Sequence, residues 1–305
     1  MSSRTASPSV FEQLLALCRE RFPRFADQWT ESRRLFGPEW EQDFSTSVGA
    51  AFGSSPSPAW DGALEGYAEF CTDALRAQVA FEKSGRYRAT SYAAVMVECY
   101  QSAEYMLRRY LPGLYLSHFI WPHHYRLVRA FVKSLLPVVA GEVRLFCEVG
   151  VGCGLYSQKT LQALSHARGV GYDISDYALD FTADVMRSHG LSDRYAVHNQ
   201  DILTSPVSNL ADLMICQEVL EHLEDPAAFV RGLYAATRSG GWGYITAAIN
   251  AAHTDHIYLY RSPDEVRAQI EAAGWRVQDV QVESSYPEKK PEFRPTIAGF
   301  LVRRG

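Results

Sequence analysis

The chain has 305 residues, of which 47% are apolar and 21% are charged, and its formal net charge is −5. This balance is typical of a globular protein of one large domain or about two domains. The negative charge argues against a nucleic-acid partner, which normally requires a basic face. No apolar run approaches the roughly 18–20 residues that span a bilayer, so we expect no membrane association.

The six cysteines are interpreted as reduced thiols. They lie far apart in the sequence, mostly within apolar segments, and none is part of a C-x-x-C pair: Cys18, Cys71, Cys99, Cys147, Cys153 and Cys216. The N-terminus has no uninterrupted apolar core of signal-peptide type. We therefore expect a cytoplasmic protein without disulfide bonds or a structural zinc site.

Residues 1–136 are predicted to form a helical lid or substrate domain. The segment "SYAAVMVECYQSAEYMLRRYL" repeats apolar residues at three- and four-residue steps for about five helical turns. Segments rich in proline and glycine, at residues 52–60 and 111–115, separate the helices. This half is rich in aromatic residues, most of which we expect in the core and some in a pocket wall. Its helices could also pair in a homodimer.

Residues 137–305 alternate short apolar runs with amphipathic segments. Strands are predicted at residues 143–150, 169–174, 194–199, 212–219, 241–249, 275–284 and 296–304, and helices at 156–167, 177–188, 226–237 and 263–273. Strands separated by helices require right-handed crossovers and predict a doubly wound α/β sheet of seven strands. The last two strands have no helix between them, which favours an antiparallel last strand.

A glycine-rich turn ends the first of these strands. In "LFCEVGVGCGLYSQKT" the glycines are Gly150, Gly152 and Gly154, and ligands of doubly wound sheets bind beyond the carboxyl ends of the strands. A dinucleotide site would need a further glycine at Leu155 or Ser157, depending on the frame. The turn therefore argues against a pyrophosphate ligand.

The segment "CEVGVGCG" resembles the first motif of the class I S-adenosylmethionine-dependent methyltransferases, which have a seven-stranded Rossmann-like sheet with an antiparallel last strand. Asp173 in "GVGYDIS" ends the second strand, where a carboxylate can accept hydrogen bonds from ribose hydroxyls. The segment "ICQEVLEHLEDP" resembles the ubiquinone-biosynthesis-like branch, which acts on small molecules. The resemblance implies that S-adenosylmethionine contacts Glu148, Gly150, Gly152, Gly154, Asp173, Ile174, Asp201, Ile202, Gln217 and Tyr125.

Histidines and aromatic residues are the candidates for the acceptor side. Trp121, His124 and Tyr115 are predicted substrate contacts. His256 is the first candidate for a general base that titrates near neutral pH, oriented by Asp255 or Asp264, and His253 is the second. His222 is a third candidate, although hydrogen bonding to a loop is its favoured role.

The function predicted from the sequence is methyl transfer to a small molecule. A metal site is a further interpretation, because imidazole and carboxylate groups are competent metal ligands and gather at His253, Asp255, His256 and His222. We assign no metal ligand, because three ligands this close in sequence form an awkward set, and metal-assisted C-methylation of an α-keto acid is kept as an alternative. An RNA or DNA methyltransferase is the second alternative.

Overall fold

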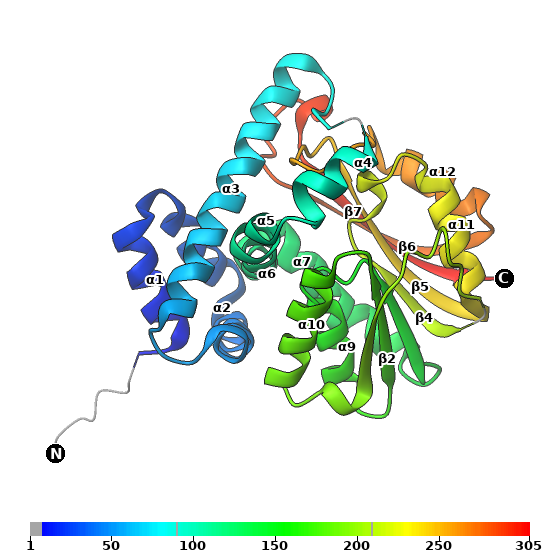
Figure 1. Ribbon diagram of the computed structural model, residues 1–305, viewed down its shortest axis with the longest axis horizontal. Helices are drawn as coiled ribbons and strands as arrows, with labels where there is room; N and C mark the ends of the chain where they lie inside the picture. Colours follow the sequence, from blue (N-terminus) through cyan, green and yellow to red (C-terminus); the bar gives the residue numbers. More distant parts are fainter. Residues whose placement is uncertain (1–7, 90, 209) are drawn as a thin grey trace.

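The structure is a computed structural model that describes residues 8–89, 91–208 and 210–305. An N-terminal helical half lies beside a seven-stranded sheet (Figure 1). The main helices of the first half are α1 (Val10–Arg21), α2 (Pro23–Phe52), α3 (Pro58–Ser84), α6 (Leu111–Ile120) and α7 (Pro122–Ala130). Shorter helical segments complete it: α4 (Tyr92–Val95), η1 (Met96–Tyr100), α5 (Ala103–Tyr105), η2 (Met106–Tyr110), η3 (Phe131–Leu135) and α8 (Leu136–Val139).

The second half contains the sheet. Its strands are β1 (Leu145–Val149), β2 (Arg168–Asp173), β3 (Tyr195–Asn199), β4 (Ala211–Cys216), β5 (Thr237–Ile249), β6 (Trp275–Ser284) and β7 (Thr296–Arg304). Its helices are α9 (Leu155–Ala163), α10 (Asp176–Ser188), α11 (Pro226–Ala236) and α12 (Pro263–Ala272), with short turns η4 (Ser192–Arg194), η5 (Leu220–His222) and η6 (Pro291–Phe293). Each predicted strand and helix of this half is present, with ends shifted by a few residues.

The strand order is β3-β2-β1-β4-β5-β7-β6. β1 to β5 pair in parallel, whereas β7 pairs antiparallel with both β5 and β6. This confirms the predicted doubly wound sheet with an antiparallel last strand. The order reverses between β1 and β4, and this reversal point is where open α/β sheets bind their ligands.

Alternate residues of the central strands face opposite sides of the sheet, as the strand period of two requires. Phe146, Leu213 and Tyr244 belong to the core shared with α9 and the helical half. Their sequence neighbours Cys147, Met214 and Ile245 belong to the core beneath α11 and α12. Both faces of the sheet are therefore covered, which explains why its central strands contain so few charged residues.

The two halves share one continuous core. Aromatic residues of α1, α2 and α6 pack edge to face around Phe44, and the same cluster continues into α9 and the sheet. A buried ion pair reinforces this junction, because the Lys159 ammonium of α9 contacts the carboxylate of Asp43 and lies 3.1 Å from Ser47 Oγ. No described helix is long and apolar enough to cross a membrane.

The Asp43 carboxylate is expected to stabilise the junction between the halves. Lys159 is only 8% exposed, so Asp43→Asn leaves a buried ammonium with a weaker partner. We expect the free energy of unfolding to fall by about 1–3 kcal/mol, measured by urea denaturation. Glu39→Gln is the matched control, because it breaks the exposed pair with Lys133 and should cause no measurable change. Equal effects of the two substitutions would contradict this account.

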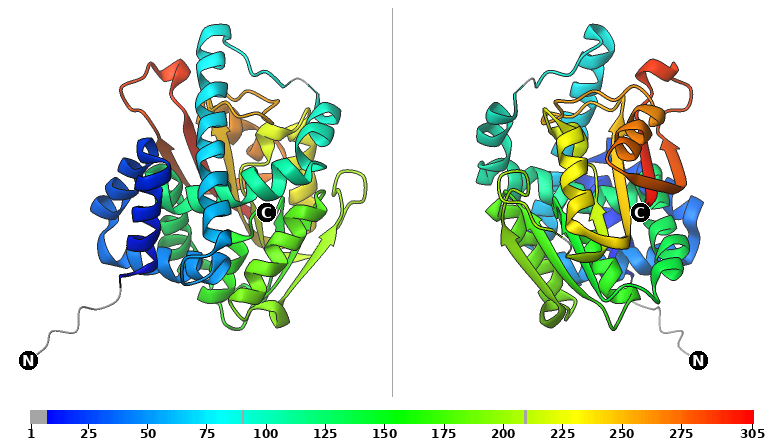
Figure 2. Two further views of the ribbon diagram at one scale, coloured as in Figure 1. Left: turned by 60° about the vertical axis from the view of Figure 1, so that its left-hand side comes forward. Right: turned by 90° about the vertical axis from the view of Figure 1, so that its right-hand side faces the viewer.

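The far end of α3 reaches the loops at the carboxyl ends of the strands. Gln78 Nε2 donates to the carbonyls of Asn250 at 3.2 Å and Phe293 at 3.0 Å, while Gln78 Oε1 accepts from Ala252 N at 2.9 Å. Figure 2 shows this end of α3 beside the red segment between β6 and β7. The helical half thus covers the ligand-binding edge of the sheet.

Candidate functional site

A cavity of about 890 Å³ lies between the carboxyl ends of the strands and the helical half. Its volume is in the range of small-molecule sites. The turns after β1, β2, β3, β4 and β5 supply one side, and α3, α7 and the segment between β6 and β7 supply the other. The predicted residues that line it are Glu148, Gly150, Gly152, Asp173, Ile174, Asp201, Ile202, Gln217, Trp121, His124, His222, His253 and His256.

The glycine turn after β1 is held next to the end of β2. Gly152 N donates to Asp173 Oδ2 at 3.2 Å, and Ser175 N donates to Asp173 Oδ1 at 2.9 Å. Each carboxylate oxygen accepts one main-chain N–H and keeps further acceptor capacity for a ligand. Gly150 has φ +73°, and a Cβ there would lie 2.4 Å from Val219 Cγ2. Only glycine allows the main chain to approach this closely.

Burial raises the pKa of two carboxyls beside this turn, those of Glu148 in β1 and Asp173 in β2. The pKa of Glu148 is about 8, because burial outweighs the hydrogen bonds from Ser157 that lower it. Ser157 donates through its main-chain N at 3.0 Å and through its hydroxyl. The pKa of Asp173 is also raised by burial, against the lowering effect of its main-chain donors. A ligand that carries positive charge would favour the ionised form of both groups.

The next two strand ends supply an apolar surface and an amide. Ile202 is buried at the cavity, and Asp201 beside it accepts from Leu203 N at 2.8 Å. Gln217 follows β4, and its side-chain oxygen is buried without a hydrogen-bond partner among the described residues. An unpartnered buried oxygen is costly unless a ligand supplies a donor.

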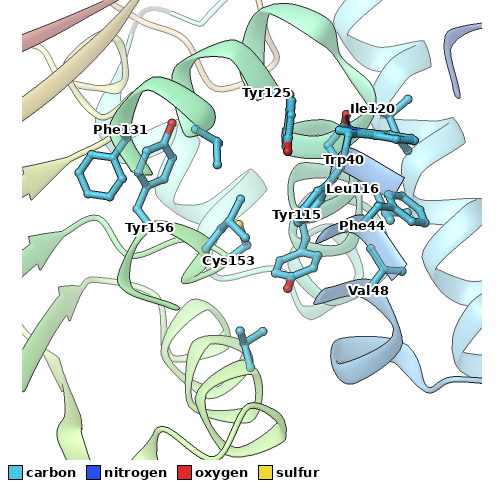
Figure 3. Packing of buried hydrophobic residues seen from close by; sticks show 14 of the residues in the cluster. Trp40, Phe44, Val48, Tyr115, Leu116, Ile120, Tyr125, Phe131, Cys153 and Tyr156 are labelled. Atoms are coloured by element: carbon cyan, nitrogen blue, oxygen red, sulfur yellow. Dashed lines mark hydrogen bonds between the residues drawn. The ribbon is translucent and has the colours of Figure 1, made fainter. Parts of the chain in front are cut away.

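Three predicted contacts are placed elsewhere. Tyr115 and Tyr125 lie among Trp40, Phe44 and Ile120 in the core of the helical half (Figure 3). The Tyr115 hydroxyl donates to Gln158 Oε1 at 2.9 Å, so it is already satisfied. Neither Tyr115, predicted as a substrate contact, nor Tyr125, predicted as a cofactor contact, lines the cavity, and both pack in the core.

Gly154 is the third residue that does not line the cavity. It precedes α9 with φ +72°, and a Cβ there would lie 2.8 Å from Thr182 Cγ2. Glycine is required at this position because α9 packs closely against α10, and the predicted ligand contact of Gly154 stays a prediction.

Trp121 and His124 lie together at the wall formed by α7. Their rings are 4.8 Å apart, and His124 Nδ1 lies 3.2 Å from Ser117 Oγ. Burial, followed by the charges of His123 and His118, holds the pKa of His124 well below its usual range. His124 is therefore a neutral polar group in a largely aromatic wall.

His253 and Asp255 form the arrangement that a general base requires. His253 Nδ1 lies 2.8 Å from Asp255 Oδ1, and His253 Nε2 is buried without a partner among the described residues. Burial alone would raise the pKa of Asp255, but His222 and the hydrogen bond from His253 lower it well below its usual range. An ionised Asp255 fixes the proton on Nδ1 and leaves the lone pair on Nε2.

His256 does not have the properties predicted for the base. Burial, followed by the charge of His222, lowers the pKa of His256 to about 3, whereas the sequence interpretation placed its titration near neutral pH. Its Nδ1 lies 2.7 Å from the carbonyl of Ala251, so Asp255 orients His253 instead. Asp264 lies in the first turn of α12 and orients neither histidine.

His222 Nδ1 lies 3.2 Å from the main-chain carbonyl of Asp255, in the loop after β5. This contact agrees with the role favoured for His222 from the sequence, which is hydrogen bonding to a loop.

Sequence reasoning missed two groups at this site. The Tyr100 hydroxyl lies 2.9 Å from His222 Nδ1 and 3.2 Å from Asp255 Oδ2, although its aromatic, helical segment had indicated core packing. Glu221 is fully buried, and neither carboxyl oxygen makes a regular hydrogen bond with another described residue. The only sign of Glu221 in the sequence was an acidic residue that stands between the apolar Leu220 and the histidine His222.

Known proteins share features of the α/β half. Residues 147–243 match the family described as "Methyltransferase domain". The chain is 33% identical over 106 residues to the ubiquinone biosynthesis O-methyltransferase of Bordetella bronchiseptica. The aligned region covers 32% of this chain and 40% of that protein. It is 28% identical over 152 residues to the enzyme of the same name from Nitrosospira multiformis. This aligned region covers 44% of this chain and 63% of that protein.

Both alignments span less than two thirds of the relative's length. Among solved structures, the pyocyanin biosynthetic protein PhzM superposes with a TM-score of 0.53 at 17% sequence identity, covering 83% of this chain and 75% of that one. At this identity the likeness concerns the fold alone. It extends to the combination of a helical N-terminal region with the α/β sheet.

Proposed function

We propose that the α/β half of this chain is a class I methyltransferase domain, and that the protein transfers the methyl group of S-adenosylmethionine to a small-molecule acceptor. The observation that carries the proposal is one cavity with two kinds of wall. The glycine turn, Asp173 and Ile202 line one part, and His253 and the aromatic residues line another.

The residues at the strand ends fit S-adenosylmethionine. Asp173 retains acceptor capacity for the ribose hydroxyls, and Ile202 offers an apolar surface to the adenine ring. The unpartnered Gln217 oxygen can accept a hydrogen bond from the amino-acid end. When bound, the cofactor supplies an electrophilic methyl group on a sulfonium.

The protein's own contribution to the reaction is alignment, exclusion of water and removal of a proton. His253 Nε2 would accept the proton that the acceptor loses on methylation, a transfer in which the cofactor would leave as its neutral thioether, and Asp255 would stabilise the resulting imidazolium. The ring of Phe70 lies 4.9 Å from that of His253, and Tyr110 packs against the same imidazole. These aromatic rings keep water from the reacting atoms.

The shape of the cavity favours a small acceptor over a macromolecule. The helical half covers the strand ends, whereas an RNA or DNA methyltransferase needs an open, basic face for its substrate. Incubation with S-adenosylmethionine and a panel of phenols, catechols and keto acids, followed by mass spectrometry, tests this choice. Binding of NADH with no binding of S-adenosylmethionine in calorimetry would refute the proposed function.

Glu148 should couple cofactor binding to pH. Its pKa of about 8 in the free protein means that it is mainly protonated at neutral pH, and a nearby sulfonium or ammonium favours ionisation. Binding should therefore release a proton, and affinity should rise with pH up to about 8 and then level. Calorimetry in two buffers of different ionisation enthalpy measures the release. Glu148→Gln should abolish it, and unchanged release in that variant would contradict the assignment.

Two further parts of the proposal rest on the sequence. A cytoplasmic location agrees with six free thiols among the described residues. A homodimer through the N-terminal helices is tested by the mass of the protein in solution, from light scattering.

A further inference from the structure

Three buried side chains gather beside the proposed base. Glu221 and His222 come from η5, and His256 comes from the loop after β5. One potential ligand atom from each residue can be chosen so that all three lie within 4.8 Å of one another. No other described residues form such a group of three.

The carboxyl group of Glu221 is buried without a well-placed side-chain donor among the described residues. The residue is 0% exposed, and neither carboxyl oxygen makes a hydrogen bond of regular geometry with another described residue. Burial, followed by the charge of Glu218, raises the pKa of Glu221 well above its usual range, against the lowering effect of the main-chain groups of Glu221 and Ala248. A buried polar group without a well-placed partner is unfavourable, and a ligand would relieve this cost. The main chain of Glu221 is well held, because its carbonyl accepts from Ile257 N at 2.7 Å and Tyr258 N at 2.9 Å. These bonds fasten the loop that contains His256 to η5.

His222 and His256 each use Nδ1 for hydrogen bonds and leave Nε2 without one to another described residue. His256 Nδ1 is engaged by the Ala251 carbonyl, and His222 Nδ1 by the Asp255 carbonyl and the Tyr100 hydroxyl. In each ring Nε2 has no hydrogen bond to another described residue. A hydrogen bond from one ring nitrogen to a carbonyl is the usual way in which proteins orient a histidine that binds a metal through the other nitrogen.

We propose that Glu221, His222 and His256 bind a divalent transition-metal cation. Two imidazoles and one carboxylate suit Zn²⁺, Mn²⁺ or Fe²⁺ better than Mg²⁺, which prefers oxygen ligands. Three protein ligands leave coordination positions open. His222 and His256 line the cavity of the proposed methyltransferase site, and Glu221 is the buried neighbour of His222 in η5. An oxygen atom of the acceptor can occupy such a position. This set replaces the one weighed from the sequence, because His253 and Asp255 hydrogen-bond to each other.

The test is calorimetric titration of chelator-treated full-length protein with Zn²⁺, Mn²⁺ and Mg²⁺ salts alone. We expect saturable binding of one Zn²⁺ or Mn²⁺ per chain and weaker binding of Mg²⁺. His222→Gln, His256→Gln and Glu221→Gln should each weaken binding by at least about tenfold. His123→Gln is the matched control, because His123 lines the same cavity outside the cluster and its loss should leave metal affinity unchanged. The visible spectrum of the Co²⁺-loaded protein provides a second readout.

The outcomes separate this inference from the proposed function. Circular dichroism checks the fold of each variant, and if Glu221→Gln does not fold, the two histidine variants decide. Failure of all three metals to bind the wild type, or unchanged affinity in both histidine variants, would overturn the metal site. Titration of S-adenosylmethionine into the same metal-free samples reports on the methyltransferase proposal independently.

Discussion

Asp173→Ala is expected to weaken the binding of S-adenosylmethionine by more than about tenfold, since hydrogen bonds to a charged acceptor are among the stronger ones in proteins. Asp173 ends β2, and both of its oxygens already accept a main-chain N–H from the turns at the cavity. The substitution removes the predicted acceptor of both ribose hydroxyls and also frees Gly152 N in the glycine turn. Calorimetry with S-adenosylmethionine and S-adenosylhomocysteine measures the change.

Two variants separate the role of Asp173 from a general loss of charge. Asp180→Ala removes an exposed carboxylate from α10, outside the cavity, and should leave affinity unchanged. Asp173→Asn keeps the size of the side chain and one acceptor oxygen, so we expect an intermediate affinity. Wild-type affinity in a folded Asp173→Ala protein would show that the ribose is held elsewhere.

His253→Ala is expected to lower kcat by about 10²–10⁴-fold, the usual contribution of a positioned general base. The residue combines an Nδ1 held by Asp255 with an unpartnered Nε2 at the cavity. Affinity for S-adenosylmethionine should stay nearly constant, because none of the predicted cofactor contacts changes. Initial rates of S-adenosylhomocysteine formation, once an acceptor is identified, measure the effect.

Rescue and control experiments test whether His253 acts through its imidazole. Added imidazole should restore part of the activity of His253→Ala, and His198→Ala, an exposed histidine on β3, should have wild-type activity. Asp255→Asn should also reduce kcat, because an amide cannot stabilise the imidazolium. Full activity of His253→Ala would mean that alignment alone suffices or that another group takes the proton.

The sequence was sufficient for the sheet because its signals are local. Short apolar runs and proline at the first turns of α11 and α12 depend on neighbours within a few positions. Parallel strands also bring their carboxyl ends to one edge, so Asp173, Asp201 and Gln217 could be predicted to meet without knowledge of the packing. The same reasoning could not separate Gly154 from its neighbours, because that glycine is required by contact with α10.

The acceptor side depended on contacts between distant segments. Tyr115 and Trp121 have similar signals in the sequence, yet Tyr115 lies in the core and Trp121 lines the cavity. The pairing of His253 with Asp255 and the placement of His256 near Glu221 depend on the path of the loop after β5 and on its main-chain bonds to Glu221. The local pattern therefore determined the fold and the cofactor edge. Only tertiary structure decided which buried polar groups pair and which remain free, because burial and hydrogen bonding at a side chain are set by its neighbours in space.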